Sequence, residues 1–134
     1  MHFFSVLNVL IAQNIENGIN RNRFDSDWRF HAGGALSAEN PKFDDAQWQV
    51  VDLPHDWSIE DLPGTKSPFN RDAIGRASVG FTTGGTGWYR KTFTLPQEQS
   101  AKRIIVQFDG VYMNPEIWIN GVSLGSHPYG YTSF

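Results

Sequence analysis

The hydrophobic pattern along the chain is clearest between residues 103 and 125. Apolar side chains at Ile104, Val106 and Phe108 alternate with the residues between them, and Asp109-Gly110 ends the run. Strict alternation is typical of a strand with one buried face. We therefore expect a strand over residues 104–108 that directs its apolar side chains into a core.

A hairpin is expected directly after this strand, at Asn120-Gly121. This dipeptide adopts positive φ at both positions with little strain, as a type I′ turn requires. The register of a two-residue loop places Ile119 opposite Val122. Two residues further from the turn, it places Ile117 opposite Leu124. These aliphatic side chains would share one face, which we expect to be core. Three consecutive antiparallel strands predict an all-β protein.

Earlier in the chain the pattern predicts three more strands. They are expected where aromatic or aliphatic residues alternate with polar ones, at residues 24–32, 49–53 and 88–95. Residues 41–48 contain acceptors suited to capping one short helical turn. Residues 54–87 show neither a helical nor a strand-like spacing of hydrophobic residues, and they are rich in Gly, Pro, Ser and Thr. A connection of this length inside a compact domain is usually functional or disordered.

The first 22 residues have two alternative interpretations. Residues 3–12 are an apolar run that is too short to span a bilayer. The run is long enough for the hydrophobic part of a secretory signal, cleaved after Ala12, or for a buried first strand. A signal would make the protein periplasmic or secreted, and its absence would leave it cytoplasmic. Residues 13–23 are Asn-rich and aperiodic, so we expect a flexible lead-in before a domain that covers residues 23–134.

Composition excludes several classes of function. The 134 residues carry a formal net charge of −3, and the eleven Lys and Arg are scattered, so no basic stripe is available for nucleic acid. No cysteine is present, and the four histidines show no metal-ligand spacing. No apolar segment is long enough for a membrane span. We expect no metal and no other cofactor.

Five blocks of the sequence, in unbroken order, resemble the amino-terminal domain of family two glycoside hydrolases. The blocks are Arg23-Phe24 with Trp28 and Phe30, PKFDD at 41–45 with Trp48, VDLPHDWSIE at 51–60, GWYRKTF at 87–93, and FDGVYMN at 108–114 continuing to Gly125. The family includes β-galactosidases, β-glucuronidases and β-mannosidases. The resemblance implies a jelly-roll β-sandwich called the sugar-binding domain, and a β-glycoside as substrate. The family members whose pattern is most similar are bacterial β-galactosidases, which are often exported.

The resemblance also implies that other domains are the partners of this one. In the family an immunoglobulin-like domain and a barrel follow, and the barrel carries both catalytic glutamates. Residues 127–134 are aromatic and turn-forming, so the sequence resembles a jelly roll cut short, with an uncovered apolar face. Pro115 departs from the family pattern, in which a small polar residue is usual. Because proline has no N–H to donate, it leaves open where the hairpin strand begins.

Three residues at the start of the long loop are candidates for substrate binding. Asp56 matches the family position that presents a polar side chain to the sugar, and its alternative role is to cap a turn. Trp57 either stacks on a sugar face or packs in a core or domain interface. His55 is a further candidate, although a structural hydrogen-bonding role is the better interpretation because no catalytic partner is identifiable.

The chain contains no evident catalytic pair. Glycoside hydrolysis needs two carboxyl groups held about 5–9.5 Å apart across the scissile bond. Asp44-Asp45 and Glu60-Asp61 are adjacent pairs whose side chains would diverge, so capping or a solvated loop is the better interpretation. Residues 84–87 lack the ending of a phosphate-binding loop.

The function expected from the sequence is therefore that of a non-catalytic domain of a β-galactosidase-like enzyme, which supports the barrel and contributes a loop to the sugar pocket. The alternatives are a free-standing carbohydrate-binding module and a purely structural or oligomerisation domain.

Overall fold

The computed structural model describes residues 9–15, 18–73, 75–99 and 103–134. These residues form strands joined by turns and by three short 3-10 helices, none of which is long and apolar enough to cross a membrane. The strands are β1 (Val9–Ile15), β2 (Gly18–Arg23), β3 (Trp28–Ala32), β4 (Gln49–Val51), β5 (Gly87–Arg90), β6 (Ile104–Phe108), β7 (Glu116–Ile119) and β8 (Val122–Ser126). The helices are η1 (Trp57–Ile59), η2 (Arg76–Val79) and η3 (Gln97–Gln99).

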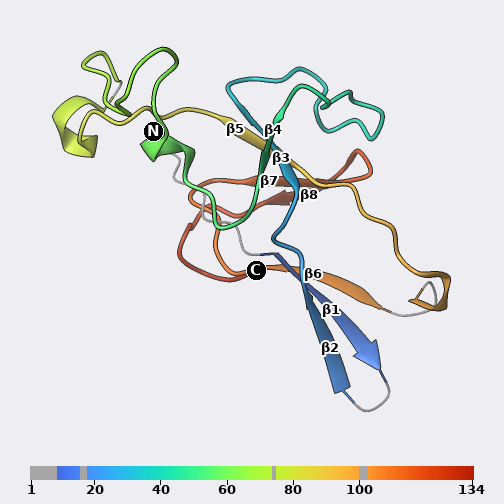
Figure 1. Ribbon diagram of the computed structural model, residues 1–134. Coiled ribbons are helices and arrows are strands. Elements are labelled where there is room, and N and C mark those ends of the chain that lie inside the picture. The colour runs from blue at the N-terminus through green and yellow to red at the C-terminus, as the bar shows by residue number, and fades with distance from the viewer. Residues whose placement is uncertain (1–8, 16–17, 74, 100–102) are drawn as a thin grey trace.

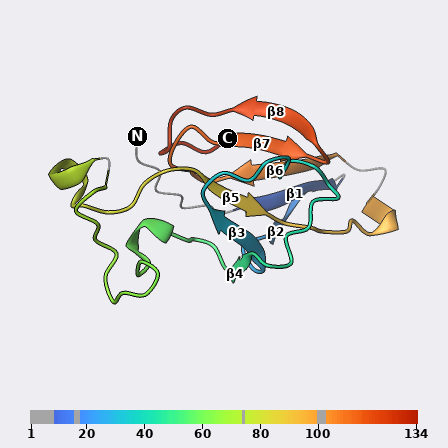
Figure 2. The ribbon, with the colours of Figure 1, turned by 90° about the horizontal axis from the view of Figure 1, so that it is seen from above.

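The strands pair only in antiparallel fashion, which confirms the expected all-β class. Their order is β2-β1-β6 in one sheet, β4-β3-β5 in a second, and β7-β8 in a two-stranded third. Residues 54–86 form a long connection that projects from one end of the sheets (Figures 1 and 2). As predicted, this connection contains little regular structure, namely η1, η2 and one isolated bridge.

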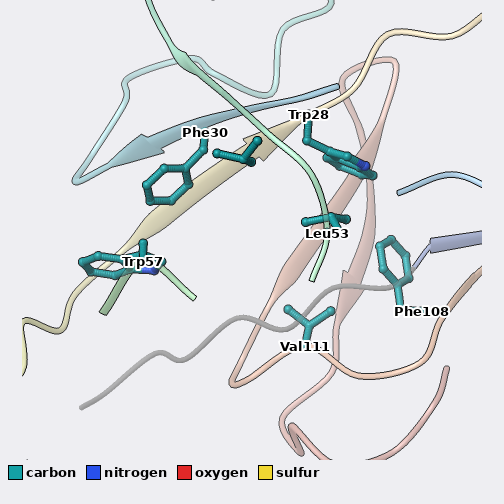
Figure 3. Packing of buried hydrophobic residues seen from close by; sticks show 7 residues of the cluster. Trp28, Phe30, Leu53, Trp57, Phe108 and Val111 are labelled. Carbon is teal, nitrogen blue, oxygen red and sulfur yellow. The ribbon is translucent and has the colours of Figure 1, made fainter. Parts of the chain in front are cut away.

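The core lies between the β4-β3-β5 sheet and the end of β6. Trp28 and Phe30 point into it from β3 and are 7% and 4% exposed, as their alternation predicted. The remaining members of the buried cluster are Val51, Leu53, Trp57, Phe108 and Val111. Figure 3 shows these side chains directed toward one another from separate segments. Their burial is the main favourable contribution to folding.

The β7-β8 hairpin turns as predicted, but its register changes beyond the turn. Asn120 and Gly121 have φ values of 52° and 81°, and Ile119 pairs with Val122. Ile117, however, pairs with Gly125 and not with Leu124, so that part of the predicted register was wrong. The physical reason is a β-bulge that inserts Leu124, because Gly125 adopts a φ of 100° that glycine tolerates best.

The apolar side chains of the hairpin are mostly exposed. Ile117 packs against the core cluster, whereas Val122 and Leu124 are 64% and 61% exposed. The prediction that this face is core was therefore wrong for the hairpin tip. The hairpin is also not paired with β6, which instead pairs with β1. The chain turns away between them at Pro115, whose carbonyl accepts the His127 N–H at 3.1 Å, and β7 begins at the next residue.

Residues 9–15 and 18–23 form strands, although a flexible lead-in was expected over residues 13–23. β1 pairs with β2 from Leu10 opposite Arg23 to Ile15 opposite Gly18, and with β6 on its other side. The ladder with β6 joins segments about 95 positions apart, so no local pattern could indicate it. Val9–Ala12 of the apolar run lie in β1, in line with the first-strand alternative, and residues 1–8 lie outside the described residues.

Four local predictions differ in extent from the structure. β4 ends at Val51, although the strand was expected to continue to Leu53. β3 begins at Trp28, and Phe24 instead packs edge-on against Trp28 with 5.8 Å between the ring centroids. β5 ends at Arg90, so the predicted strand over residues 88–95 was too long. No helical turn forms at 41–48, where the Asp44 carboxylate accepts the Ala46 N–H at 3.0 Å and caps a simple turn.

Residues 127–134 pack beside the end of β6, and Phe134 contacts the core cluster. Phe134 and Phe108 exchange two backbone hydrogen bonds of 2.9 and 3.0 Å. The Phe134 ring stacks on Phe108 and on His127, with centroid distances of 5.0 and 4.2 Å. Gly130, which is also in this last segment, lies directly against Tyr112. A Cβ at Gly130 would be 2.5 Å from the Tyr112 ring and 2.9 Å from the Tyr112 Cα.

We predict that Gly130→Ala destabilises the protein by about 1–3 kcal/mol, the usual cost of overpacking, because the backbone of Tyr112 must move. The matched control is Gly34→Ala, since a Cβ at Gly34 meets nothing within 4 Å. Urea unfolding of the two variants and the parent measures the difference. Equal free energies of unfolding for both variants would contradict the close packing of residues 127–134.

Candidate functional site

The candidate site begins where β4 leads into the long loop. Leu53 is buried, and its N–H donates to the Asp25 carbonyl at 2.8 Å. The carboxylate of Asp52 accepts the Asp27 N–H at 2.9 Å. These two contacts attach the end of β4 to the segment that precedes β3. The three residues predicted as a site follow at once, so the position of the loop start is determined by the sheet.

Asp56 caps the short helix η1. Its Oδ1 accepts hydrogen bonds from the Ser58 N–H at 3.0 Å and from the Ser58 hydroxyl at 2.7 Å. Ser58 is 1% exposed, so the carboxylate satisfies a buried polar residue. The capping role considered from the sequence is thus confirmed. Within the described part of the chain no group donates to Oδ2, and this oxygen of a half-buried carboxylate stays available to a ligand.

His55 is held between two polar side chains. Its Nδ1 lies 2.8 Å from the Tyr89 hydroxyl and its Nε2 lies 2.8 Å from Glu60 Oε1. A proton on Nε2 satisfies both contacts, because the ring then donates to the carboxylate and accepts from the hydroxyl. Its side chain is 12% exposed and the ring packs edge-on against Phe30. The structure favours the hydrogen-bonding role over direct substrate contact.

Trp57 lies in the core. It is 7% exposed and packs beside Phe30 with ring centroids 6.0 Å apart. Gly87 of β5 allows this approach, because a Cβ there would be 3.1 Å from both Trp57 Nε1 and the Phe30 ring. This burial supports the packing interpretation of Trp57. Gly87 at the end of the 84–87 turn therefore has a packing role.

Three of the four adjacent carboxylates, Asp44, Asp45 and Glu60, are engaged in structural contacts, and Asp61 is exposed. Asp45 pairs with Arg90 Nε at 2.8 Å, while the Arg90 guanidinium also donates to the Ala38 carbonyl. Glu60 binds His55 and accepts from Gln49 Nε2 at 3.1 Å. Among the described residues no group of three or more metal-ligating side chains could hold a metal ion.

The sequence did not reveal the partners of His55. Tyr89 was expected on the buried face of its strand, but nothing local connected it with a residue 34 positions earlier. Glu60 lies only five positions after His55 and was considered solely with Asp61 as a carboxylate pair. The loop turn at Asp56 brings Glu60 back toward the histidine ring. The chain therefore places His55, Asp56 and Glu60 together, with Trp57 directed into the core.

Comparison with known proteins gives close matches to parts of larger glycosidases. The chain is 49% identical over 114 residues to a beta-galactosidase of Bacteroides ovatus and 30% identical over 111 residues to a beta-glucuronidase of Formosa agariphila. These matches cover 85% and 83% of the chain but 13% and 11% of those proteins. No protein-family model matches the chain.

A solved structure agrees with this result. The fold matches a glycosyl hydrolase family 2 member from Bacteroides cellulosilyticus with a TM-score of 0.79 and 52% sequence identity. That match covers 83% of the chain and 14% of the solved one. The chain thus spans a small part of the relatives it resembles.

We predict that the purified chain does not hydrolyse nitrophenyl β-galactoside, β-glucuronide or β-mannoside. Hydrolysis requires two carboxyl groups on opposite sides of the scissile bond. Each candidate pair has at least one member held in a structural contact, since Asp44 caps a turn, Asp45 pairs with Arg90 and Glu60 binds His55. Release of nitrophenol is the measurement. Turnover that co-purifies with the chain and disappears in the Glu60→Gln variant would contradict this prediction.

Proposed function

Because the chain belongs to glycosyl hydrolase family 2, we propose that it is the non-catalytic amino-terminal domain of a β-galactosidase-like enzyme. In this proposal the domain is a jelly-roll sandwich that supports a catalytic barrel and contributes one loop to the sugar pocket. The all-β antiparallel architecture and the small fraction of each relative that the chain spans support it.

The proposal that the loop contacts substrate is based on the hydrogen bonding of the Asp56 carboxylate, in which only one of the two oxygens has a partner among the described residues. Oδ1 is occupied by the two Ser58 donors, which hold the side chain in one orientation. Oδ2 is then the group that accepts a hydrogen bond from a sugar hydroxyl. A carboxylate oriented by its own helix cap loses little conformational freedom on binding, so the interaction is pre-organised.

His55 and Trp57 position this carboxylate from either side in the chain. His55 is anchored through Tyr89 and Glu60, and Trp57 is anchored in the core, so the residue between them cannot move independently. We propose that both act on substrate through Asp56. The substrate would be a β-galactoside, as the relative from Bacteroides ovatus suggests, with a β-glucuronide as the alternative.

The exposed side of the hairpin favours a supporting role in addition. Val122 and Leu124 are more than half exposed although both are aliphatic. Neighbouring exposed aliphatic residues mark surfaces that other protein segments cover. We propose that further domains of the enzyme pack here.

We also propose that the enzyme is exported, because residues 3–12 resemble the hydrophobic part of a secretory signal. Amino-terminal sequencing of the mature protein tests this proposal.

We predict that, in the complete enzyme, Asp56→Ala lowers kcat/KM by roughly 5- to 150-fold, because an unpaired hydroxyl in a water-poor pocket costs about 1–3 kcal/mol. The same variant loses about 1 kcal/mol of stability with the helix cap. Asp56→Asn is the matched control for stability, because asparagine caps a helix about as well as aspartate.

Steady-state kinetics and thermal unfolding of both variants separate the two roles of Asp56. Asn should restore the melting temperature, while the galactoside kcat/KM stays lowered because the charged acceptor is lost. If Asp56→Ala lowers the melting temperature and leaves kcat/KM unchanged, Asp56 is only a cap and the domain does not contact substrate there.

A further inference from the structure

Within the long loop, residues 67–73 and 75–82 form a projection. Phe69 and Thr82 form an antiparallel bridge, and the Asn70 N–H donates to the Phe81 carbonyl at 2.8 Å. The Phe69 N–H donates to the Ser67 hydroxyl at 3.1 Å. The bridge and the Asn70 hydrogen bond join the two sides of the projection, and the Ser67 hydroxyl caps one of them.

Two phenylalanines are nevertheless exposed on this projection. Phe69 is 62% exposed and Phe81 is 38% exposed. Phe81 also has a φ of 61°, which is rare for an aromatic residue, and its N–H donates to the Arg76 carbonyl at 2.8 Å. Non-glycine residues persist in this region only where surrounding contacts hold them, and such positions cluster at ligand sites. The projection therefore presents two rings to solvent at the expense of backbone strain.

The two rings and one arginine line a groove. Phe69, Arg71 and Phe81 line a hollow of about 540 Å³ that is open to solvent. This volume lies within the roughly 300–1,000 Å³ of small-molecule sites, which are walled mostly by apolar and aromatic side chains with a few polar groups. No ion pair joins Arg71 to a carboxylate in the part of the chain that the structure describes. The groove thus combines aromatic walls with one available positive charge.

The chemistry of the groove selects its ligand. A sugar ring would need partners for several hydroxyl groups, and the three lining residues supply only the guanidinium. A flat apolar group stacks on aromatic rings, and a planar guanidinium binds a carboxylate through two parallel hydrogen bonds. We propose that the groove lined by Phe69, Arg71 and Phe81 binds an aromatic carboxylate.

This site would serve the enzyme by binding the leaving group of its substrate. The groove is on the same loop that begins with Asp56, and the end of the loop returns beside Trp57, where a Cβ at Gly87 would touch the indole. This role rests on the proposed function, whereas binding of the aromatic carboxylate itself does not.

Binding can be tested on the chain itself with probes that contain no sugar. The ¹⁵N-labelled 134-residue chain is titrated with 2-naphthoate and, separately, with neutral 2-naphthalenemethanol, and amide shifts are followed by NMR. We predict saturable shifts at residues 69–82 with both probes, and 3- to 10-fold tighter binding of the carboxylate. Arg71→Gln should reduce naphthoate affinity to that of the alcohol and leave alcohol binding unchanged. Phe69→Ser should weaken binding of both probes.

The matched control is Arg103→Gln, which removes an exposed arginine elsewhere and should alter neither affinity. Dispersion of the amide spectrum shows in each variant that the fold is retained. Equal affinities for the two probes, shifts confined to other residues, no saturable shifts, or an unchanged preference in Arg71→Gln would each overturn the proposal. Because the probes lack a sugar, such a result leaves the role of Asp56 untouched, and loss of that role leaves this site untouched.

Discussion

The burial of the Phe30 ring is the interaction on which both the core and the candidate site depend. Phe30 is 4% exposed on β3, and its ring lies 4.8 Å from the centroids of both His55 and Tyr89 and 6.0 Å from that of Trp57. The hydrophobic contact therefore brings strand β5 and the start of the long loop to one point. Once the ring is buried, the hydroxyl of Tyr89 meets the imidazole, and the polar network forms on an apolar base.

This arrangement explains how a loop residue can be positioned accurately. Loops lie on the surface and carry function when a rigid scaffold holds them. Here the scaffold reaches both neighbours of Asp56, because His55 is hydrogen-bonded on both ring nitrogens and Trp57 is buried. The cap to Ser58 occupies one oxygen of the Asp56 carboxylate. The observed cap therefore does not conflict with the proposed contact between Asp56 and a sugar hydroxyl, because the cap uses only one of the two carboxylate oxygens.

The candidate site was only partly predictable. Asp56 was identified by its place in a sequence block and by the turn chemistry around it. The contact of His55 with Tyr89 was not, because it depends on the pairing of β3 with β5 across a long connection. The groove around Arg71 was also not predicted. Residues 54–87 show no periodic hydrophobic pattern, and Phe69 and Phe81 line the same groove because of a bridge between Phe69 and Thr82.

The sequence by itself determined the features that depend on neighbouring residues. Alternation predicted the buried face of β3 and the burial of Phe108 at the end of β6, and Asn120-Gly121 predicted its turn, because side-chain direction and positive φ are local properties. The tertiary structure alone decided what depends on distant partners. It paired β1 with β6. A bulge in β8 also paired Ile117 with Gly125 in place of Leu124. A ladder between distant segments is selected by the packing of the whole chain, and no short sequence window contains that information.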